Sequence, residues 1–228
     1  MQPKGLESAG ELSDAVAIRS ARPEHASAIV SLVRSGFAPD VLAYTIYGCE
    51  GVASYIHEEL SAAAGLSARQ FMVAVAAESV VGVVDATLSS RVHLNYITVH
   101  PAQQRSGLGT RMMTELAAFA YGRWHRECIA LDVLDTNPGV LRWYESLGFS
   151  IESTTHWWTG VLPTTAKPVK TRACVAGLPF ALRSLDRFGF ATVQIATDQG
   201  EHTVGLLGDR LFRIKSTDLQ DPDLTYTL

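Results

Sequence analysis

The residues best suited to chemistry lie where a strand pattern runs into a polar loop, two glycines and then a helix pattern. Glycine lets the backbone approach a ligand closely, and successive N–H groups at a helix start form a positive concavity for an anion. Arg105 adds a cation that can contact a diphosphate. This segment, the glycine turn, therefore predicts a phosphate site, with a plain strand-to-helix turn as the alternative. It consists of Gln104, Arg105, Ser106, Gly107, Leu108, Gly109 and Thr110.

Two common phosphate loops are excluded at this position. A dinucleotide-binding fingerprint requires a third glycine at position 112, where the chain has Met112. An ATP-binding loop requires a Gly-Lys pair followed by Ser or Thr, and no such triplet follows the glycine turn.

The glycine turn resembles the Q/R-x-x-G-x-G/A acetyl-CoA signature of the GNAT superfamily of N-acetyltransferases. It is preceded by the hydrophobic-x-hydrophobic-x-Pro pattern usual in that family, at Ile97, Val99 and Pro101. Downstream, residues 137–149 resemble the family's N-x6-Y-E-x-x-G-F helix. The two motifs occur in the family's order, separated by a helix pattern and a strand pattern, and the resemblance covers roughly residues 15–158.

The resemblance implies an enzyme that moves an acetyl group from acetyl-CoA to a primary amine, by direct attack on the thioester and without a metal. Backbone groups of Ile97, Thr98 and Val99 are expected to bond the pantetheine arm of the co-substrate. The amides of residues 105–110 are expected to hold its diphosphate. Asn137 is expected to contact the pantetheine region.

Tyr144 and Asp132 are the catalytic candidates. Tyr144 stands where many family members place the group that protonates the departing thiolate, and a thiol pKa of about 8.5 makes a nearby phenol a useful donor. The alternative is a tyrosine packed between Trp143 and Phe149. Asp132 lies on an expected strand, and its position resembles that of the catalytic glutamate in ribosomal-protein N-acetyltransferases. The alternative is a shorter carboxylate that faces solvent or bonds nearby backbone.

Several polar and aromatic residues near the central strand pattern are weaker candidates. A lone histidine at a strand end is more often structural than catalytic, and Asp85 interrupts an apolar run. Two aromatic pairs are candidates for an acceptor pocket, although core packing is favoured for Trp157. The remaining residues of this group are Tyr44, Tyr47, His93, Asn95, His100 and Trp158.

Helix and strand patterns alternate up to about residue 160. Strands are expected at 15–19, 70–77, 80–89, 92–100, 127–134 and 149–158, and helices from 22 onward and at 51–63, 107–121 and 139–147. Tight turns between the second, third and fourth strands make them antiparallel. The pattern predicts an α/β (α+β) domain at 15–160, with a mixed, mostly antiparallel central sheet flanked by helices, as in the GNAT fold.

The remaining residues predict a flexible leader at 1–14, a linker at 161–170 and a C-terminal extension at 171–228. The extension pattern is a helix at 179–188 and a β-meander, with Gly208–Asp209 suited to a two-residue turn. About 50 residues barely bury a core alone, so we expect the extension to pack against the acetyltransferase domain or a dimer mate.

The composition limits the partners and the compartment. The chain has 228 residues, 47% hydrophobic and 18% charged, with a formal net charge of −4 and no basic run. This argues against a nucleic acid or an anionic membrane as partner. The N-terminus has no apolar segment, and an odd number of cysteines without paired spacing indicates a reducing compartment, so a cytoplasmic location is expected. The cysteines are Cys49, Cys128 and Cys174.

The sequence leaves the acceptor open. A peptide N-terminus, a lysine, an aminoglycoside and a polyamine are all compatible, and the mild negative charge favours a cationic acceptor. The glycine turn is expected to contact only the CoA part of the donor, so this motif does not distinguish acetyl-CoA from longer acyl-CoA donors. The alternative from another class is a non-catalytic acyl-CoA sensor or interaction module that uses the C-terminal extension.

Overall fold

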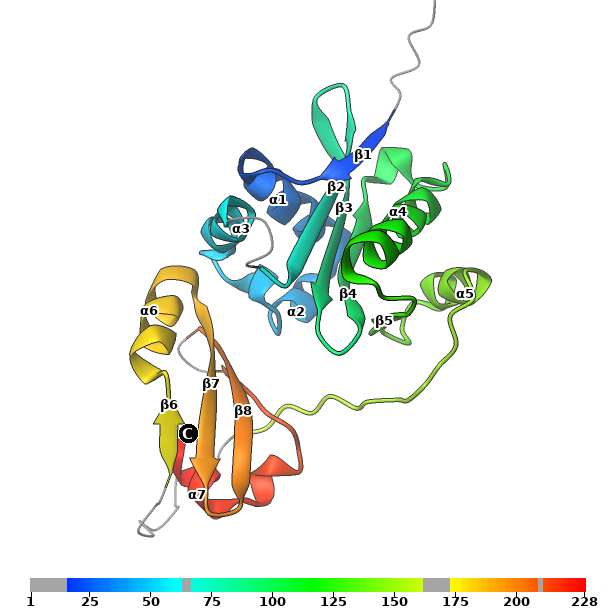
Figure 1. Ribbon diagram of the computed structural model, residues 1–228. Coiled ribbons are helices and arrows are strands. Elements are labelled where there is room, and N and C mark those ends of the chain that lie inside the picture. Colours follow the sequence, from blue (N-terminus) through cyan, green and yellow to red (C-terminus); the bar gives the residue numbers. More distant parts are fainter. Residues whose placement is uncertain (1–15, 63–66, 162–172, 209–210) are drawn as a thin grey trace, which may run out of the picture. The chain divides into compact units, whose positions relative to one another are not determined.

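The computed structural model describes residues 16–62, 67–161, 173–208 and 211–228 (Figure 1). These residues form two compact units. Unit one comprises 16–21 and 67–131, and unit two comprises 22–62 together with the described residues from 132 onward.

Unit one is built on a five-stranded sheet with the order β1-β2-β3-β4-β5. The first four strands are antiparallel neighbours, and β5 pairs in parallel with β4. Ala77 and Glu78, both with positive φ, close the tight turn between β2 and β3. The expected mixed, mostly antiparallel sheet is confirmed. Its strands are β1 (Ala17–Ser20), β2 (Arg69–Ala76), β3 (Ser79–Leu88), β4 (Val92–Val99) and β5 (Ile129–Leu131).

Helix α4 (Leu108–Trp124) lies across β3 and β4 in unit one (Figure 1). Its apolar residues recur every three or four positions, so they form one stripe that is buried against the sheet. Gly82 permits the close approach, because a Cβ there would lie 2.6 Å from the sulfur of Met112. The buried stripe is Leu108, Met112, Met113, Leu116 and Ala120.

Unit two contains the remaining helices of the N-terminal half and helix α5. Pro23 starts the first turn, η1 (Pro23–His25), as its fixed φ favours. Arg34 ties the following loop to α1, since its guanidinium donates to the carbonyls of Tyr47 (2.8 Å) and Cys49 (2.9 Å). The other elements are α1 (Ala26–Gly36), α2 (Pro39–Leu42), η2 (Ile46–Gly48), α3 (Val52–Ser61) and α5 (Pro138–Ser146).

A second sheet, with the order β6-β7-β8-β9, forms the C-terminal part of unit two. Its strands are all antiparallel, and side chains from α6 and α7 join one face of β7 and β8 in a small apolar core. The core residues are Ala181, Ala191, Val193, Ile195, Val204 and Leu224. The elements are β6 (Cys174–Ala176), α6 (Leu178–Phe188), β7 (Phe190–Thr197), β8 (Gly200–Leu207), β9 (Leu211–Arg213), η4 (Asp218–Gln220) and α7 (Pro222–Thr227).

The end of α6 packs against the start of α3. The ring of Tyr55 meets Phe188 and Phe190 edge to face, with centroids 5.6 and 5.0 Å away. A Cβ on Gly51 would lie 2.4 Å from the Cα of Phe188, so only glycine fits at this contact. An ion pair between Glu58 and Arg187 borders it.

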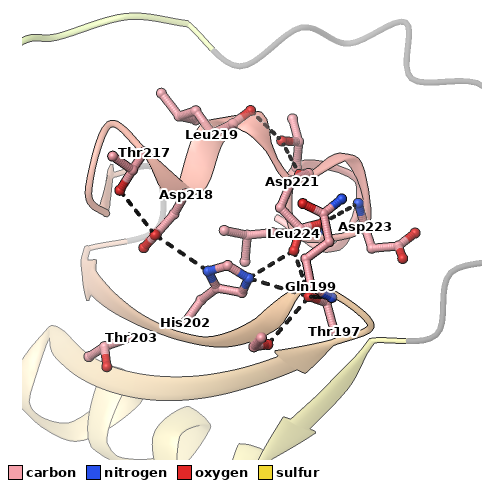
Figure 2. A network of polar contacts seen from close by, with 12 residues as sticks. Thr197, Gln199, His202, Thr203, Thr217, Asp218, Leu219, Asp221, Asp223 and Leu224 are labelled. Atoms are coloured by element: carbon pink, nitrogen blue, oxygen red, sulfur yellow. Dashed lines mark hydrogen bonds and ion pairs between the residues drawn. The ribbon is translucent and has the colours of Figure 1, made fainter.

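His202 and Asp221 join α7 to the second sheet (Figure 2). The imidazole Nε2 of His202 lies 2.8 Å from Oδ2 of Asp221, and the hydroxyl of Thr197 donates to the same oxygen at 2.5 Å. The other oxygen accepts the backbone N–H groups of Asp223 and Leu224, which caps α7. One buried carboxylate therefore joins the start of α7 to the two inner strands of the sheet, β7 and β8.

These contacts predict that the stability of the fold falls in acid, and that Asp221→Asn removes this part of the pH dependence. Burial raises the pKa of the Asp221 carboxyl, but its four hydrogen bonds outweigh this and leave the pKa below the ordinary value of 3.8. The carboxylate therefore stabilises the fold above that value and loses this contribution as the pH falls below it. We expect the urea midpoint to drop between pH 7 and pH 3, and we expect this drop to be larger in the unaltered chain than in Asp221→Asn. Parallel pH profiles would contradict the assignment.

One expected strand is shorter than predicted, and one is wrong. The strand expected at 127–134 is confined to Ile129–Leu131. Residues 149–158, also expected as a strand, have no regular secondary structure, and those from Ile151 onward are exposed. In the described part of the chain these residues pair with no strand, and a strand needs that pairing. Trp157, expected in the core, is 56% exposed and stacks on the guanidinium of Arg213.

The other expected helices and strands are present within a few residues of their predicted bounds, while β6 and α7 were not anticipated. The leader at 1–14 and Asp209 of the expected hairpin turn lie outside the described residues, and Val161 alone represents the linker.

Candidate functional site

The glycine turn connects the end of β4 to the N-terminus of α4. A single 3-10 turn, η3 (Pro101–Gln103), precedes it, and the side chain of His100 caps that turn. Gln104 donates to the carbonyl of Val99 at 3.0 Å, which fastens the loop to the strand end. Arg105 (φ 60°) and Gly107 (φ 82°) both take left-handed backbone conformations. Two left-handed residues within three positions turn the chain sharply into the helix.

The turn fits an anion. Gly107 is the N-cap of a helix 17 residues long, whose dipole favours negative charge at that end. The first turn of α4 has no acidic residue, and Arg105 is exposed beside it. A Cβ on Gly107 would meet no described atom within 4 Å, so the space beside the glycine is open. The residues present therefore suit the diphosphate that the sequence predicts here.

The edge of β4 on the β5 side is open in its second half. β5 pairs only with residues 92–94, so no described strand covers Asn95–Val99 on that side. His100 donates its N–H to Val81 of β3 (2.8 Å), and backbone groups alternate sides along a strand. The backbone groups of Ile97 and Val99 therefore face the open edge, and those of Thr98 face β3. Among the three residues expected to bond pantetheine, Ile97 and Val99 have the suitable orientation.

The side chain of Thr98 adds a second feature to this strand. Thr98 is buried, at 7% exposure, and its hydroxyl has no hydrogen-bond partner among the described residues. A buried hydroxyl without a partner costs free energy, of the order of 1–3 kcal/mol. The sequence did not single out this side chain, because a threonine in a strand is ordinary.

Asp85 is buried in unit one, and its oxygens are engaged. Arg69 donates to Oδ1 at 2.8 Å and to Oδ2 at 2.5 Å, and Asn95 donates to Oδ1 at 3.0 Å. Three donors already occupy these oxygens, so the carboxylate is not placed to contact an acceptor amine, which argues against a base role. Of the two histidines, His100 caps η3, and His93 lies half-buried on β4.

Asn137 and Tyr144 both lie on α5 in unit two. Asn137 is the N-cap of α5, and its Oδ1 accepts the N–H of Val140 at 3.2 Å. This capping role accounts for an asparagine before Pro138, and it leaves the side-chain NH2 group for the expected contact with acetyl-CoA.

Tyr144 is 7% exposed and is packed between two aromatic rings. The ring of Trp143 lies 4.7 Å away and that of Phe149 lies 5.5 Å away, in an edge-to-face arrangement. Burial raises the pKa of the Tyr144 phenol to about 12. The phenol therefore stays protonated throughout the physiological range, as a proton donor must.

Asp132 lies directly after β5 rather than within a strand, and it is exposed. Of the two alternatives for this residue, its exposure agrees with a carboxylate that faces solvent. Tyr47, a candidate for an acceptor pocket, is fully buried, while Tyr44 is 39% exposed.

The described residues provide no group of three or more His, Cys, Asp or Glu side chains that could hold a metal ion. All three cysteines are free thiols. None of the described helices is long and apolar enough to cross a membrane.

Residues 42–149 match the model of a family described as the acetyltransferase (GNAT) family. No curated protein matches the chain. The matched residues include β2 to β5, the glycine turn and all of α5, but exclude the C-terminal extension.

Solved structures share the fold at low sequence identity. A transcriptional regulator from Bacillus halodurans C-125 matches with TM-score 0.53 and 20% identity, over 64% of this chain and 99% of that one. The PaiA N-acetyltransferase from Thermoplasma acidophilum, in complex with coenzyme A, matches with TM-score 0.53 and 14% identity, over 62% and 93%. AAC(6')-Iy, in complex with the bisubstrate analogue CoA-S-monomethyl-acetylneamine, matches with TM-score 0.52 and 17% identity, over 64% and 98%.

Proposed function

Because residues 42–149 belong to the acetyltransferase (GNAT) family, we propose that this acetyl-CoA-dependent enzyme acetylates a primary amine by direct attack on the thioester. The observation that carries the proposal is the continuous path from an open strand edge to a helix N-terminus. Ile97 and Val99 present backbone groups at that edge, and Gly107 then turns the chain into α4. Two structures of the same fold contain coenzyme A or a CoA-based analogue, which supports this choice of co-substrate.

The residues of unit one are proposed to hold acetyl-CoA, which supplies an activated acetyl thioester. The open edge of β4 bonds the pantetheine arm as an added strand would. The N–H groups of residues 105–110 and the cation of Arg105 hold the diphosphate. Asn137 on α5 is proposed to contact the pantetheine region with its side-chain NH2 group.

Tyr144 is proposed to assist departure of the thiolate. Its pKa of about 12 lies roughly 3.5 units above that of a thiol, near 8.5. Complete proton transfer from this buried phenol would be uphill by about 5 kcal/mol at 1.36 kcal/mol per unit. We therefore infer that Tyr144 acts first by donating a hydrogen bond to sulfur as charge develops there.

The base that deprotonates the amine is proposed to be Asp132, acting through water. Its side chain is exposed, so a water molecule can connect it to an incoming ammonium group. The acceptor class is proposed to be a small or peptidic primary amine of positive charge, because the chain carries a net charge of −4.

Titration of acetyl-CoA into the full chain, followed by an acceptor panel, tests the proposal. We expect a micromolar dissociation constant, and CoA release with at least one of a polyamine, an aminoglycoside, a lysine peptide and a free peptide N-terminus. Failure to bind acetyl-CoA would overturn the proposal. Tight binding without turnover on any acceptor would favour a non-catalytic acyl-CoA sensor.

A further inference from the structure

An extra residue in β4 lies where β4 and β5 separate. Asp85 of β3 pairs with Tyr96, and the next β3 residue pairs with Leu94, so Asn95 has no partner and forms a β-bulge. The last β4–β5 pair joins Leu94 to Leu131. A bulge bends its strand and increases the local twist, so the open edge of β4 begins at the bulge.

The side chain of Asn95 fixes this bulge. Its amide donates to Oδ1 of Asp85 at 3.0 Å and to the hydroxyl of Thr87 at 2.7 Å. The two acceptors lie on either side of Ala86 on β3, so one amide spans the site of the irregular pairing. An unpaired extra residue is thereby given two fixed contacts across the strand.

Asp85 is itself held rigidly from β2. Arg69 makes a bidentate ion pair with it, and Asp85 is fully buried while the side chain of Arg69 is 14% exposed. A buried ion pair contributes little net stability compared with apolar residues of similar size, because both charges lose their hydration. Its bidentate geometry nevertheless fixes the carboxylate in one orientation. The ion pair therefore acts mainly by orienting the Asp85 carboxylate, and only slightly by stabilising the fold.

We propose that Arg69, Asp85 and Asn95 are positioning residues that hold the bulge, and with it the open edge of β4, in the register that acetyl-CoA requires. Backbone groups alternate sides along a strand, so a slip of one residue would turn those of Ile97 and Val99 from the open edge toward β3. The identity of the ligand rests on the proposed function, whereas the dependence of the bulge on Asn95 does not.

Three variants of the full chain separate positioning from stability. Asn95→Ala removes the amide and keeps the ion pair, and Arg69→Met with Asp85→Leu removes the pair without leaving an unpaired charge. Val73→Ala is the matched control, because it removes buried methyl groups from β2 without touching the network. We expect the first two variants to bind acetyl-CoA at least ten-fold more weakly than the unaltered chain. The control is expected to bind it within two-fold of the unaltered chain. The urea midpoints of the first two variants should fall no further than that of the control. Normal binding by Asn95→Ala and by the pair variant would overturn the proposal.

Amide hydrogen exchange of Thr98 and His100, whose backbone groups face β3, measured without ligand makes the result independent of the proposed function. Loss of the Asn95 amide is expected to speed exchange there at least ten-fold relative to the control. If the unaltered chain does not bind acetyl-CoA, the proposed function fails and exchange alone decides the positioning role. Unchanged exchange in Asn95→Ala would then overturn that role.

Discussion

Replacing Gly109 by leucine is expected to abolish acetyl-CoA binding, by at least 100-fold in the dissociation constant, while leaving the chain at least as stable as before. Gly109 is the second residue of α4, where the proposed diphosphate approaches the backbone. A side chain there would occupy the position of the ligand. Leucine ranks just below alanine as a helix former, and glycine is about 0.8–1 kcal/mol worse than alanine, so stability should not fall. Calorimetry and thermal unfolding of the same sample measure both quantities.

Gly122→Ala is the matched control for this experiment. Gly122 lies near the other end of α4, and a Cβ there meets no described atom within 4 Å. The control gains helix propensity as Gly109→Leu does, but its change is more than three helical turns from the glycine turn. Normal affinity is therefore expected. Loss of binding in both variants would mean that any change to α4 disturbs binding. Normal binding in both would argue against a diphosphate site at the glycine turn.

Replacing Tyr144 by phenylalanine is expected to lower kcat about 100-fold without changing the affinity for acetyl-CoA. The variant removes only the hydroxyl, and general acid assistance of this kind contributes about 10²–10⁴-fold. Packing against Trp143 and Phe149 is retained, so the thermal midpoint should change little. Steady-state kinetics with an accepted amine measure the effect.

The pH dependence gives the control for Tyr144. With a pKa of about 12, the phenol stays protonated up to about pH 11. Below that pH we therefore expect kcat of the unaltered chain and of Tyr144→Phe to change with pH in the same way at the alkaline end. An unchanged kcat in Tyr144→Phe would assign the residue to packing alone.

The sequence predicted the local features of the site well. Gly107 was identified as a turn residue because two glycines follow a strand pattern, and its φ of 82° is the conformation that glycine adopts easily. The packing of Tyr144 between Trp143 and Phe149, given as the alternative to a catalytic role, is present because the chain turns at Gly148 and brings Phe149 back against the helix. Such features depend on residues close in the chain, where composition and period are informative.

Features that depend on cross-strand partners were not predictable. The bulge at Asn95 arises from the register between β3 and β4, and nothing in the local pattern marks it. Residues 149–158 were expected as a strand, yet a strand also needs a neighbouring strand to pair with, and a local pattern does not provide one. Asp132 was expected inside a strand, but that strand ends one residue earlier, and the exposed side chain agrees with the solvent-facing alternative.

The contact at Gly51 allows a single substitution, Gly51→Ala, to loosen the C-terminal extension from α3. Alanine at this position would bring a Cβ against the backbone of Phe188, which cannot move aside as a flexible side chain would. The extension could thus be loosened from α3 in a full-length chain, with β4 and the glycine turn unaltered. Any influence of the tail on acetyl transfer would then be open to direct comparison, in a chain that keeps the small apolar core of the extension.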